Sequence, residues 1–385
     1  MSDDSRPLHL AVALDGTGWH PASWREPDAR PTELLSARYW TDLVGEAERG
    51  LLDFVTIEDA LTPQYDDPFH ADDRRDRVRG RLDAVLIASR VAPLTRHIGL
   101  VPTAVVTHTE PFHLSKSIAT LDYVSSGRAG IRVQVTASPE AARHFGRRDI
   151  TQTSGADLLA EAADYVEVLR RLWDSWEDGA EIRDVASGRF IDRTKLHYID
   201  FEGATFSVRG PSITPRPPQG QPIVAALGHG DPAYALIAGS ADVGFITPRD
   251  ASEVTAAVDA IASRRDTGLP PVRVFADLVV FLDGSVDAAR ARRHRLDDRA
   301  GGFVSDAEIF AGTPAQLAEL IEEWHSAGAT GFRLRPAVLP HDLTRITDTL
   351  VPELRRRGVF HEAYGAGTLR DTLGLSRPAN RYVVV

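Results

Sequence analysis

Eight short runs of β-branched and apolar residues alternate with helical patterns along the 385-residue chain, which predicts the α/β class and a (β/α)8 TIM barrel. The alternation favours a parallel sheet with crossover helices, and eight such units fit a closed barrel better than an open doubly wound sheet. Neither an internal repeat nor a linker divides the sequence. We therefore expect one domain over residues 1–385, with insertions near 177–217 and 301–312 and a C-terminal extension from about residue 358.

The first half of the predicted barrel contains four strands bounded by turn residues. We expect these strands at 8–14, 54–59, 98–106 and 129–137. Helical spacing predicts helices at 37–50, 82–93, 111–127 and 154–176. The helix before the fourth strand starts at Pro111 and stops at Gly127, which are the residue types that helix ends favour.

The second half follows a stretch in which short polar pieces, glycines and the proline cluster TPRPPQGQP interrupt the pattern. Four more strands are expected at 222–227, 241–247, 272–281 and 331–336. The helices that alternate with them are expected from about Pro232, and at 250–264, 284–297, 314–327 and 341–357.

The composition limits the partners and the compartment. With 43% hydrophobic residues the chain can bury a large core, and its net charge of −11 argues against nucleic acid or an anionic membrane as a partner. Cysteine is absent, which excludes disulfides, thiolate metal sites and cysteine nucleophiles. The N-terminus has no signal-peptide pattern and no long apolar run follows, so we expect a cytoplasmic protein.

The fourth predicted strand carries polar residues where a buried parallel strand is normally apolar. Spacing of two places Arg132, Gln134 and Thr136 on one face of that strand. If this face is the barrel interior, the arginine needs an anionic or hydrogen-bonding partner. A ligand with carbonyl or phosphate groups would supply one. Glu58 or Asp59, at the end of the second strand, would supply another as a structural ion pair, and both interpretations can hold together.

Proton transfer has three candidates at the strand ends, where this fold places its chemistry. They are Glu58, Asp59 and His108, and His20 is a further histidine of the same rim. The alternative for each histidine is a hydrogen-bonded structural role. Motifs such as H-E-x-x-H, G-x-S-x-G and Walker A are absent, which weakens the hydrolase and metalloenzyme hypotheses, and we predict no metal site.

Candidate cofactor contacts also lie at the strand ends. Gly228, His229 and Gly230 precede a helix start and resemble an anion cradle, in which backbone N–H groups and the helix dipole face a phosphate. The alternative is that the glycines serve tight turn geometry. Thr103 ends the third strand and faces the same rim.

Several segments together carry a family resemblance through their order and spacing. They are PFHLSKSIATLDYVSSGRAG, AARHFGRR, YVEVLRRLWDSWEDGA, GATFSVRGPSITPRPPQGQPIV, SADVGF and LVPELRRRGVFHEAYGAGTLRDTLGL. Over nearly its whole length the chain resembles the luciferase-like flavin-dependent monooxygenases, in particular the group of nitrilotriacetate, dibenzothiophene-sulfone and long-chain alkane monooxygenases.

The resemblance implies an enzyme whose barrel binds reduced FMN supplied by a separate flavin reductase. O₂ would add at flavin C4a, and the C4a-peroxide would oxygenate a small organic substrate. Arg132 and Gln134 suit the pyrimidine edge of the flavin, and Thr103, Thr136 and residues 228–230 complete the implied cofactor contacts. Barrels of this kind commonly pair through exposed helices, so we expect a homodimer.

The chain also departs from the family pattern. Relatives read G-W-N-x-V-T-S at the fourth strand, so Arg132 stands at their flavin-contacting asparagine and Thr136 at their serine. Leu159 stands at a tyrosine, and Gly230 falls within a segment that reads A-G-x-S in relatives. Where luciferases have Glu-His after the second strand, this chain has Glu58 and Asp59.

The main hypothesis is therefore a two-component FMN-dependent monooxygenase. An F420-dependent oxidoreductase on the same barrel is the first alternative. A non-catalytic flavin-binding protein and a metal-dependent barrel hydrolase are two others. The substrate would be determined by the loop after the first strand, the loop near 60–80 and the insertions at 177–217 and 301–312.

Overall fold

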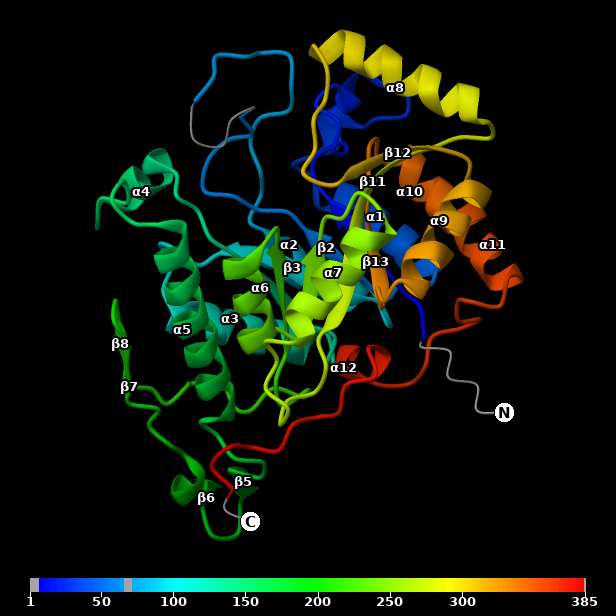
Figure 1. The fold of residues 1–385 in the computed structure, drawn as a ribbon. Coiled ribbons are helices and arrows are strands. Elements are labelled where there is room, and N and C mark those ends of the chain that lie inside the picture. The colour runs from blue at the N-terminus through cyan, green and yellow to red at the C-terminus, as the bar shows by residue number, and fades with distance from the viewer. Residues whose placement is uncertain (1–6, 66–70, 384–385) are drawn as a thin grey trace.

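The structure is a computed structural model that describes residues 7–65 and 71–383. Its centre is a closed barrel of eight parallel strands, with helices around the outside (Figure 1). The strands are β1 (His9–Leu14), β2 (Phe54–Ile57), β3 (Gly99–Val105), β4 (Gly130–Gln134), β9 (Ile223–Gly228), β10 (Val243–Ile246), β11 (Arg273–Leu282) and β13 (Gly331–Pro336). The predicted (β/α)8 barrel is confirmed.

The strands pair in chain order, and the ring closes where β10 pairs with β11 and β13 pairs with β1. In the register, Val12 of β1 lies opposite Val55 on one side and Leu334 on the other. Helices cover the outer face and side chains fill the inside. Most barrel strands are therefore continuous apolar runs, and the polar residues within them stand out.

The helices lie between consecutive barrel strands. They are α1 (Ala37–Arg49), α2 (Ala84–Val91), α3 (Pro111–Val124), α5 (Gly155–Asp174), α6 (Asp231–Ser240), α7 (Ala251–Ala262), α8 (Val286–Ala300) and α9 (Pro314–Ser326). The helix predicted over 341–357 consists of α10 (His341–Arg345), a π-helical turn over Ile346–Leu350 and α11 (Val351–Arg356). Within residues 7–65 and 71–383, no helix is both long and apolar enough to cross a membrane.

Three segments have secondary structure that the sequence did not predict. α4 (Pro139–Phe145) lies between β4 and α5, and β12 (Glu308–Gly312) follows α8. β12 pairs with Leu278–Leu282 of β11, just beyond the residues of β11 that pair with β10. Residues 177–217 contain two small hairpins, β5–β6 (Glu181–Asp184 and Arg189–Ile191) and β7–β8 (Phe201–Glu202 and Ser207–Val208).

The C-terminal extension packs against the barrel core. It contains α12 (Leu369–Thr372), and its buried Leu369, Leu373 and Leu375 form one apolar cluster with barrel residues that include Phe54 and Phe275. Leu369 also contacts the backbone position of Gly99 at the start of β3, which places the extension at the N-terminal end of the barrel. The opposite end, formed by the strand C-termini, carries the polar residues described below.

Candidate active site

Arg132 of β4 lies inside the barrel and makes the ion pair that was one of its two predicted roles. Its Nη1 donates to Glu58 Oε2 at 2.8 Å, to Thr103 Oγ1 at 3.1 Å and to Gln134 Oε1 at 3.0 Å. Only 5% of Arg132 is exposed. Its Nε is buried and has no hydrogen-bond partner among the described residues. Arg132 therefore retains a donor after the ion pair is made.

Two further arginines, which the sequence analysis missed, join this ion pair from β13. Arg333 Nε donates to Asp277 Oδ1 of β11 at 2.8 Å, and Arg335 Nε donates to Asp277 Oδ2 at 3.0 Å. Arg333 Nη1 also reaches Glu58 Oε1 at 3.3 Å. Glu58, Arg132, Asp277, Arg333 and Arg335 thus form one buried network, which we name the interior charge cluster.

Within the interior charge cluster three arginines meet two carboxylates, and the third carboxylate that balances them, Asp306, lies just outside it. Burial alone would raise the pKa of Asp277, but Arg333 and Arg335 hold that pKa below its usual range. Arg335 has a further partner outside the cluster, since its Nη1 donates to Asp306 Oδ1 at 2.5 Å. The Asp277 carboxylate is therefore a charged anion and not a proton donor.

Gln134 is held in one amide orientation by the cluster. Its Oε1 accepts from Arg132, and its amide nitrogen makes no hydrogen bond to another described residue. The side chain is only partly buried. Thr136, two residues further on, accepts from Ser138 N at 3.2 Å and lies in the turn before α4. The Gln134 amide and Arg132 Nε are thus N–H donors, and the carbonyl oxygens and ring nitrogens of a flavin can accept hydrogen bonds from them. The site fits the cofactor that the resemblance implies.

The three residues of the predicted anion cradle, Gly228, His229 and Gly230, have different roles in the structure. A Cβ at Gly228 would lie 2.9 Å from Ile237 and 3.0 Å from Tyr234, so this glycine allows α6 to pack closely on β9. His229 is exposed, and its Nδ1 lies 2.9 Å from Thr247 Oγ1. Gly230 is the N-cap of α6 and supplies no side-chain cap, so the first N–H groups of that helix remain available.

The other candidate residues lie in separate environments. Asp59 accepts from Ala60 N at 2.7 Å and from Ala84 N at 3.0 Å, and burial raises its pKa. His108 stacks on Phe145 of α4 at 5.3 Å between ring centroids, its Nε2 has no partner among the described residues, and burial lowers its pKa. His20 is fully buried and its Nδ1 accepts from Ala22 N at 3.1 Å, which is a structural role.

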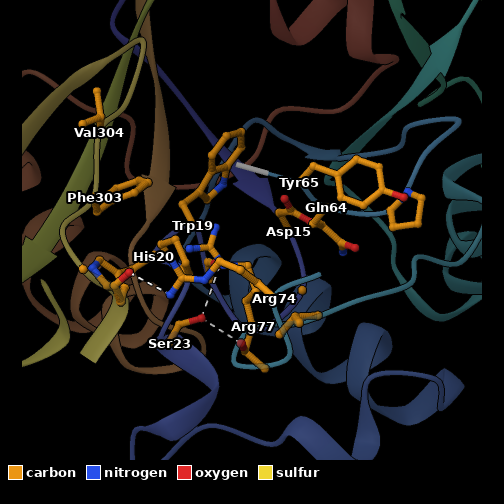
Figure 2. A pocket seen from close by; sticks show the side chains of 18 of the residues that line it. Asp15, Trp19, His20, Ser23, Gln64, Tyr65, Arg74, Arg77, Phe303 and Val304 are labelled. Atoms are coloured by element: carbon orange, nitrogen blue, oxygen red, sulfur yellow. Dashed lines mark hydrogen bonds between the residues drawn. The ribbon is translucent and has the colours of Figure 1, made fainter. Parts of the chain in front are cut away.

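A cavity of about 590 Å³ lies beside the cluster, and we name it the mouth pocket (Figure 2). Residues of three segments line it, from the loop after β1 (15–23), the loop after β2 (62–65 and 74–81) and the region after α8 (300–304). Trp19 connects the pocket to the cluster, because its ring lies 4.5 Å from the Arg335 guanidinium. Its indole Nε1 donates to Ala13 O at 3.0 Å, which fixes the ring in place.

Comparison with known proteins gives this barrel a family. The profile of the luciferase-like monooxygenases matches residues 19–301. The chain belongs to the luciferase-like monooxygenase family. It is 31% identical to N-acetyl-S-(2-succino)cysteine monooxygenase of Bacillus subtilis (strain 168), an alignment that covers 99% of this chain and all of the relative. It is 29% identical to nitrilotriacetate monooxygenase component A of Aminobacter aminovorans, over 98% of each chain.

A solved structure supports the same fold. Riboflavin lyase (RcaE), crystallised with modified FMN and riboflavin, superposes with a TM-score of 0.85 at 24% identity, over 97% of both chains. The predicted family and the prediction of an enzyme are confirmed by these comparisons. The missed arginines had a sequence signal, since Arg333 and Arg335 stand two residues apart in GFRLRP, the same spacing that drew attention to Arg132 and Gln134.

Proposed function

We propose that this protein is a two-component FMN-dependent monooxygenase that oxygenates a small organic substrate bound in the mouth pocket. Reduced FMN would come from a separate flavin reductase, and it would supply the activation of O₂ at its C4a carbon. The observation that carries the proposal is the pair of uncommitted donors at the barrel interior, Arg132 Nε and the Gln134 amide. We further propose that the chain works as one domain and as a homodimer.

The interior charge cluster suits a flavin that carries negative charge. Its three arginines meet two buried carboxylates, and Asp306, which pairs with Arg335, is a third carboxylate whose side chain is 40% exposed. All five side chains of the cluster are at most 9% exposed. In so dry a site a neighbouring anion is stabilised more strongly than in water. Arg132, whose Nε has no partner among the described residues, would therefore favour the anionic form of the reduced ring, and Gln134 would orient that ring by donating to its pyrimidine edge.

The flavin phosphate would lie at the N-terminus of α6. The N-terminus of α5 is closed by its own capping box, in which Ser154 and Asp157 bond to each other's backbone. The N-terminus of α6 has no side-chain cap, and His229 beside it is exposed. Asp231 in its first turn would repel a phosphate, but it is paired with Arg264 at 2.9 Å. Thr103, through Arg132, would support the ring.

Proton handling is assigned to Asp59 and His108 in preference to Glu58. Glu58 is held by two arginines, at 2.8 Å from Arg132 and 3.3 Å from Arg333, and it therefore serves to position them. Burial raises the pKa of Asp59 and lowers that of His108, and it therefore favours the uncharged form of both groups. Groups of this kind can exchange a proton near neutral pH.

Titration with flavin tests the proposal. Reduced FMN, added anaerobically, is expected to bind more tightly than oxidised FMN, and Gln134→Ala is expected to weaken binding of reduced FMN by about tenfold because two N–H donors are lost. Gln152→Ala, at an exposed glutamine, is the matched control and should bind like the unmodified protein. Oxygen uptake with FMN supplied by a flavin reductase measures the activity.

Each alternative gives a different result. Binding and oxidation of F420H₂ without oxygen uptake would favour the F420-dependent oxidoreductase. Binding of reduced FMN with no substrate that is oxygenated across a broad panel would favour a non-catalytic flavin-binding protein. Failure to bind any reduced flavin would reject all of these functions.

A further inference from the structure

The charged side chains that line the mouth pocket already have partners in the protein. Arg81 Nε lies 3.2 Å from Asp15 Oδ1, and Arg81 Nη2 lies 2.7 Å from Asp15 Oδ2. Arg74 makes a similar fork onto Asp76, at 2.9 Å and 2.6 Å. Arg77 is not without a partner either. A charged ligand would therefore have to compete with these partners for each of these ions.

Uncharged polar side chains of the lining are also hydrogen-bonded within the wall. Gln64 uses both ends of its amide on Gly80, since its Nε2 donates to Gly80 O at 3.2 Å and its Oε1 accepts from Gly80 N at 2.9 Å. The hydroxyls of Thr17 and Ser23 bond to each other at 2.7 Å. A ligand that hydrogen-bonds to these groups would replace a bond that the protein already makes, so such a contact adds little affinity.

Aromatic rings form the rest of the wall. Trp19, Tyr65 and Phe303 all line the cavity, and Figure 2 shows Phe303 and Tyr65 on either side of Trp19. The Tyr65 hydroxyl donates to Glu140 Oε1 at 3.1 Å, so the polar end of this ring is also used by the protein. The cavity of about 590 Å³ has the size of a small-molecule site. Ring surface is therefore what the wall offers to a ligand.

Trp19 is held in place before any ligand binds. Its Nε1 donates to Ala13 O at 3.0 Å, and the Arg335 guanidinium lies 4.5 Å from the centre of its ring. Arg335 is 1% exposed and is not among the residues that line the pocket, so it covers the indole from the barrel side. The rest of the indole faces the cavity. A ring that is already ordered loses little conformational entropy when a ligand packs on it.

We propose that the mouth pocket binds an uncharged aromatic substrate, whose ring packs against Trp19, Tyr65 and Phe303. This inference rests on the proposed function, because it names the substrate class of the same site. Stacked and edge-to-face ring pairs gain affinity beyond the area that they bury, by about two- to tenfold. Trp19 lies between the pocket and Arg335 of the interior charge cluster, so a ring bound on Trp19 lies next to the barrel interior.

Calorimetric titration of the purified chain without flavin tests the ring preference directly. The probes are benzyl alcohol, benzamide and acetophenone, each compared with the analogue that has a cyclohexane ring. The aromatic member of a pair is expected to bind about two- to tenfold more tightly, although burial alone would favour the more apolar cyclohexane. Benzoate is expected to bind no more tightly than benzamide. Equal affinity within the pairs, tighter binding of benzoate, or binding of none of the probes would overturn the proposal.

Variants then locate the binding site. Trp19→Leu keeps an apolar side chain but removes the ring, and it is expected to lower the ratio of aromatic to saturated affinity by about twofold or more. Trp19→Phe keeps a ring and should lower that ratio by less. Phe190→Leu is the matched control, because Phe190 is 64% exposed on β6 and does not line the pocket. Circular dichroism checks the folding of each variant, and the comparison within a probe pair needs no variant. An unchanged ratio in Trp19→Leu, or an equal decrease in Phe190→Leu, would reject the assigned site.

Failure of this inference is distinguishable from failure of the proposed function, because the calorimeter contains no flavin. Preference for the aromatic probes in a chain that binds no reduced flavin would reject the monooxygenase and leave the aromatic site in place. Binding of reduced FMN by a chain that does not discriminate between aromatic and saturated probes would keep the monooxygenase and reject the aromatic substrate.

Discussion

Asp277→Asn is the substitution that tests the interior charge cluster most severely. Asp277 is fully buried on β11 and accepts from both Arg333 and Arg335, each through two nitrogens. The asparagine keeps the volume but removes the charge, and its amide N–H₂ group would face guanidinium donors. Loss of one member of a buried ion pair costs about 3–5 kcal/mol, because the partner charge remains buried. We expect a decrease of that size in the free energy of unfolding.

Urea unfolding followed by tryptophan fluorescence and far-UV circular dichroism measures this decrease. Asp348→Asn is the matched control, since Asp348 pairs with Arg49 at 2.6 Å but is 49% exposed, and an exposed pair contributes at most about 1 kcal/mol. Removing the charge of Arg333, which Asp277 compensates, should restore part of the lost free energy of unfolding. The double variant Asp277→Asn with Arg333→Met is therefore expected to be more stable than Asp277→Asn alone.

The pH dependence has a defined sign. The folded-state pKa of Asp277 is below its ordinary value of 3.8, so its stabilising contribution is complete at neutral pH and is lost only as the pH falls below that value. Asp277→Asn should therefore flatten the acid limb of the stability curve. If Asp277→Asn were within about 1 kcal/mol of the unmodified protein, water would have to solvate the cluster, and the argument for a dry flavin site would fail.

Two further substitutions probe the barrel outside the cluster. Burial raises the pKa of Asp122 to about 6, so the folded state binds the proton more tightly than the unfolded state, and stability decreases as the pH rises from about 4 to 6. Asp122→Asn should remove that slope, which amounts to about 3 kcal/mol, in urea unfolding at successive pH values; an unchanged slope would refute the assignment. Gly18 has φ +126°, and a Cβ there would lie 2.4 Å from Ala337 O. Gly18→Ala should therefore lower the thermal unfolding midpoint and distort the mouth pocket. Gly284→Ala, where a Cβ meets nothing within 4 Å, is its control.

Most barrel strands were predictable because they are compact apolar runs between turn residues. The last one, 331–336, carries two arginines and still has the predicted bounds. β12 was not predicted, because EIFAG is five residues long, mostly half-buried, and is a strand only through its pairing with the outer half of β11. That pairing is a property of the tertiary structure. α4 is different, since Ser138, Pro139 and Gly146 are ordinary helix-end residues and its sequence signal was present.

The residue types of the candidate site were predictable from the sequence, but the partners of those residues were not. Spacing of two identified the face that carries Arg132 and Gln134, and the same rule applied to β13 would have identified Arg333 and Arg335. Asp277 could not have been found in this way, because it is a single acid within the apolar run VRVFADLVVF. Its role depends on β11 and β13 being neighbours in a register that places Asp277 opposite Arg333, and strand register is not encoded locally.

The two interpretations of Arg132 that the sequence left open are compatible in the structure, and the reason is the number of donors on a guanidinium. An arginine has five N–H groups, and a carboxylate that accepts from one nitrogen leaves the N–H groups of the other nitrogens available. Arg132 contacts Glu58, Thr103 and Gln134 through Nη1 alone, and its buried Nε has no partner among the described residues. The ion pair offsets the cost of burying the charge, and the unpaired Nε still costs free energy until something accepts from it. A buried side chain in that condition is expected to bind a ligand acceptor, which is why the structural ion pair strengthens the argument for a flavin instead of replacing it.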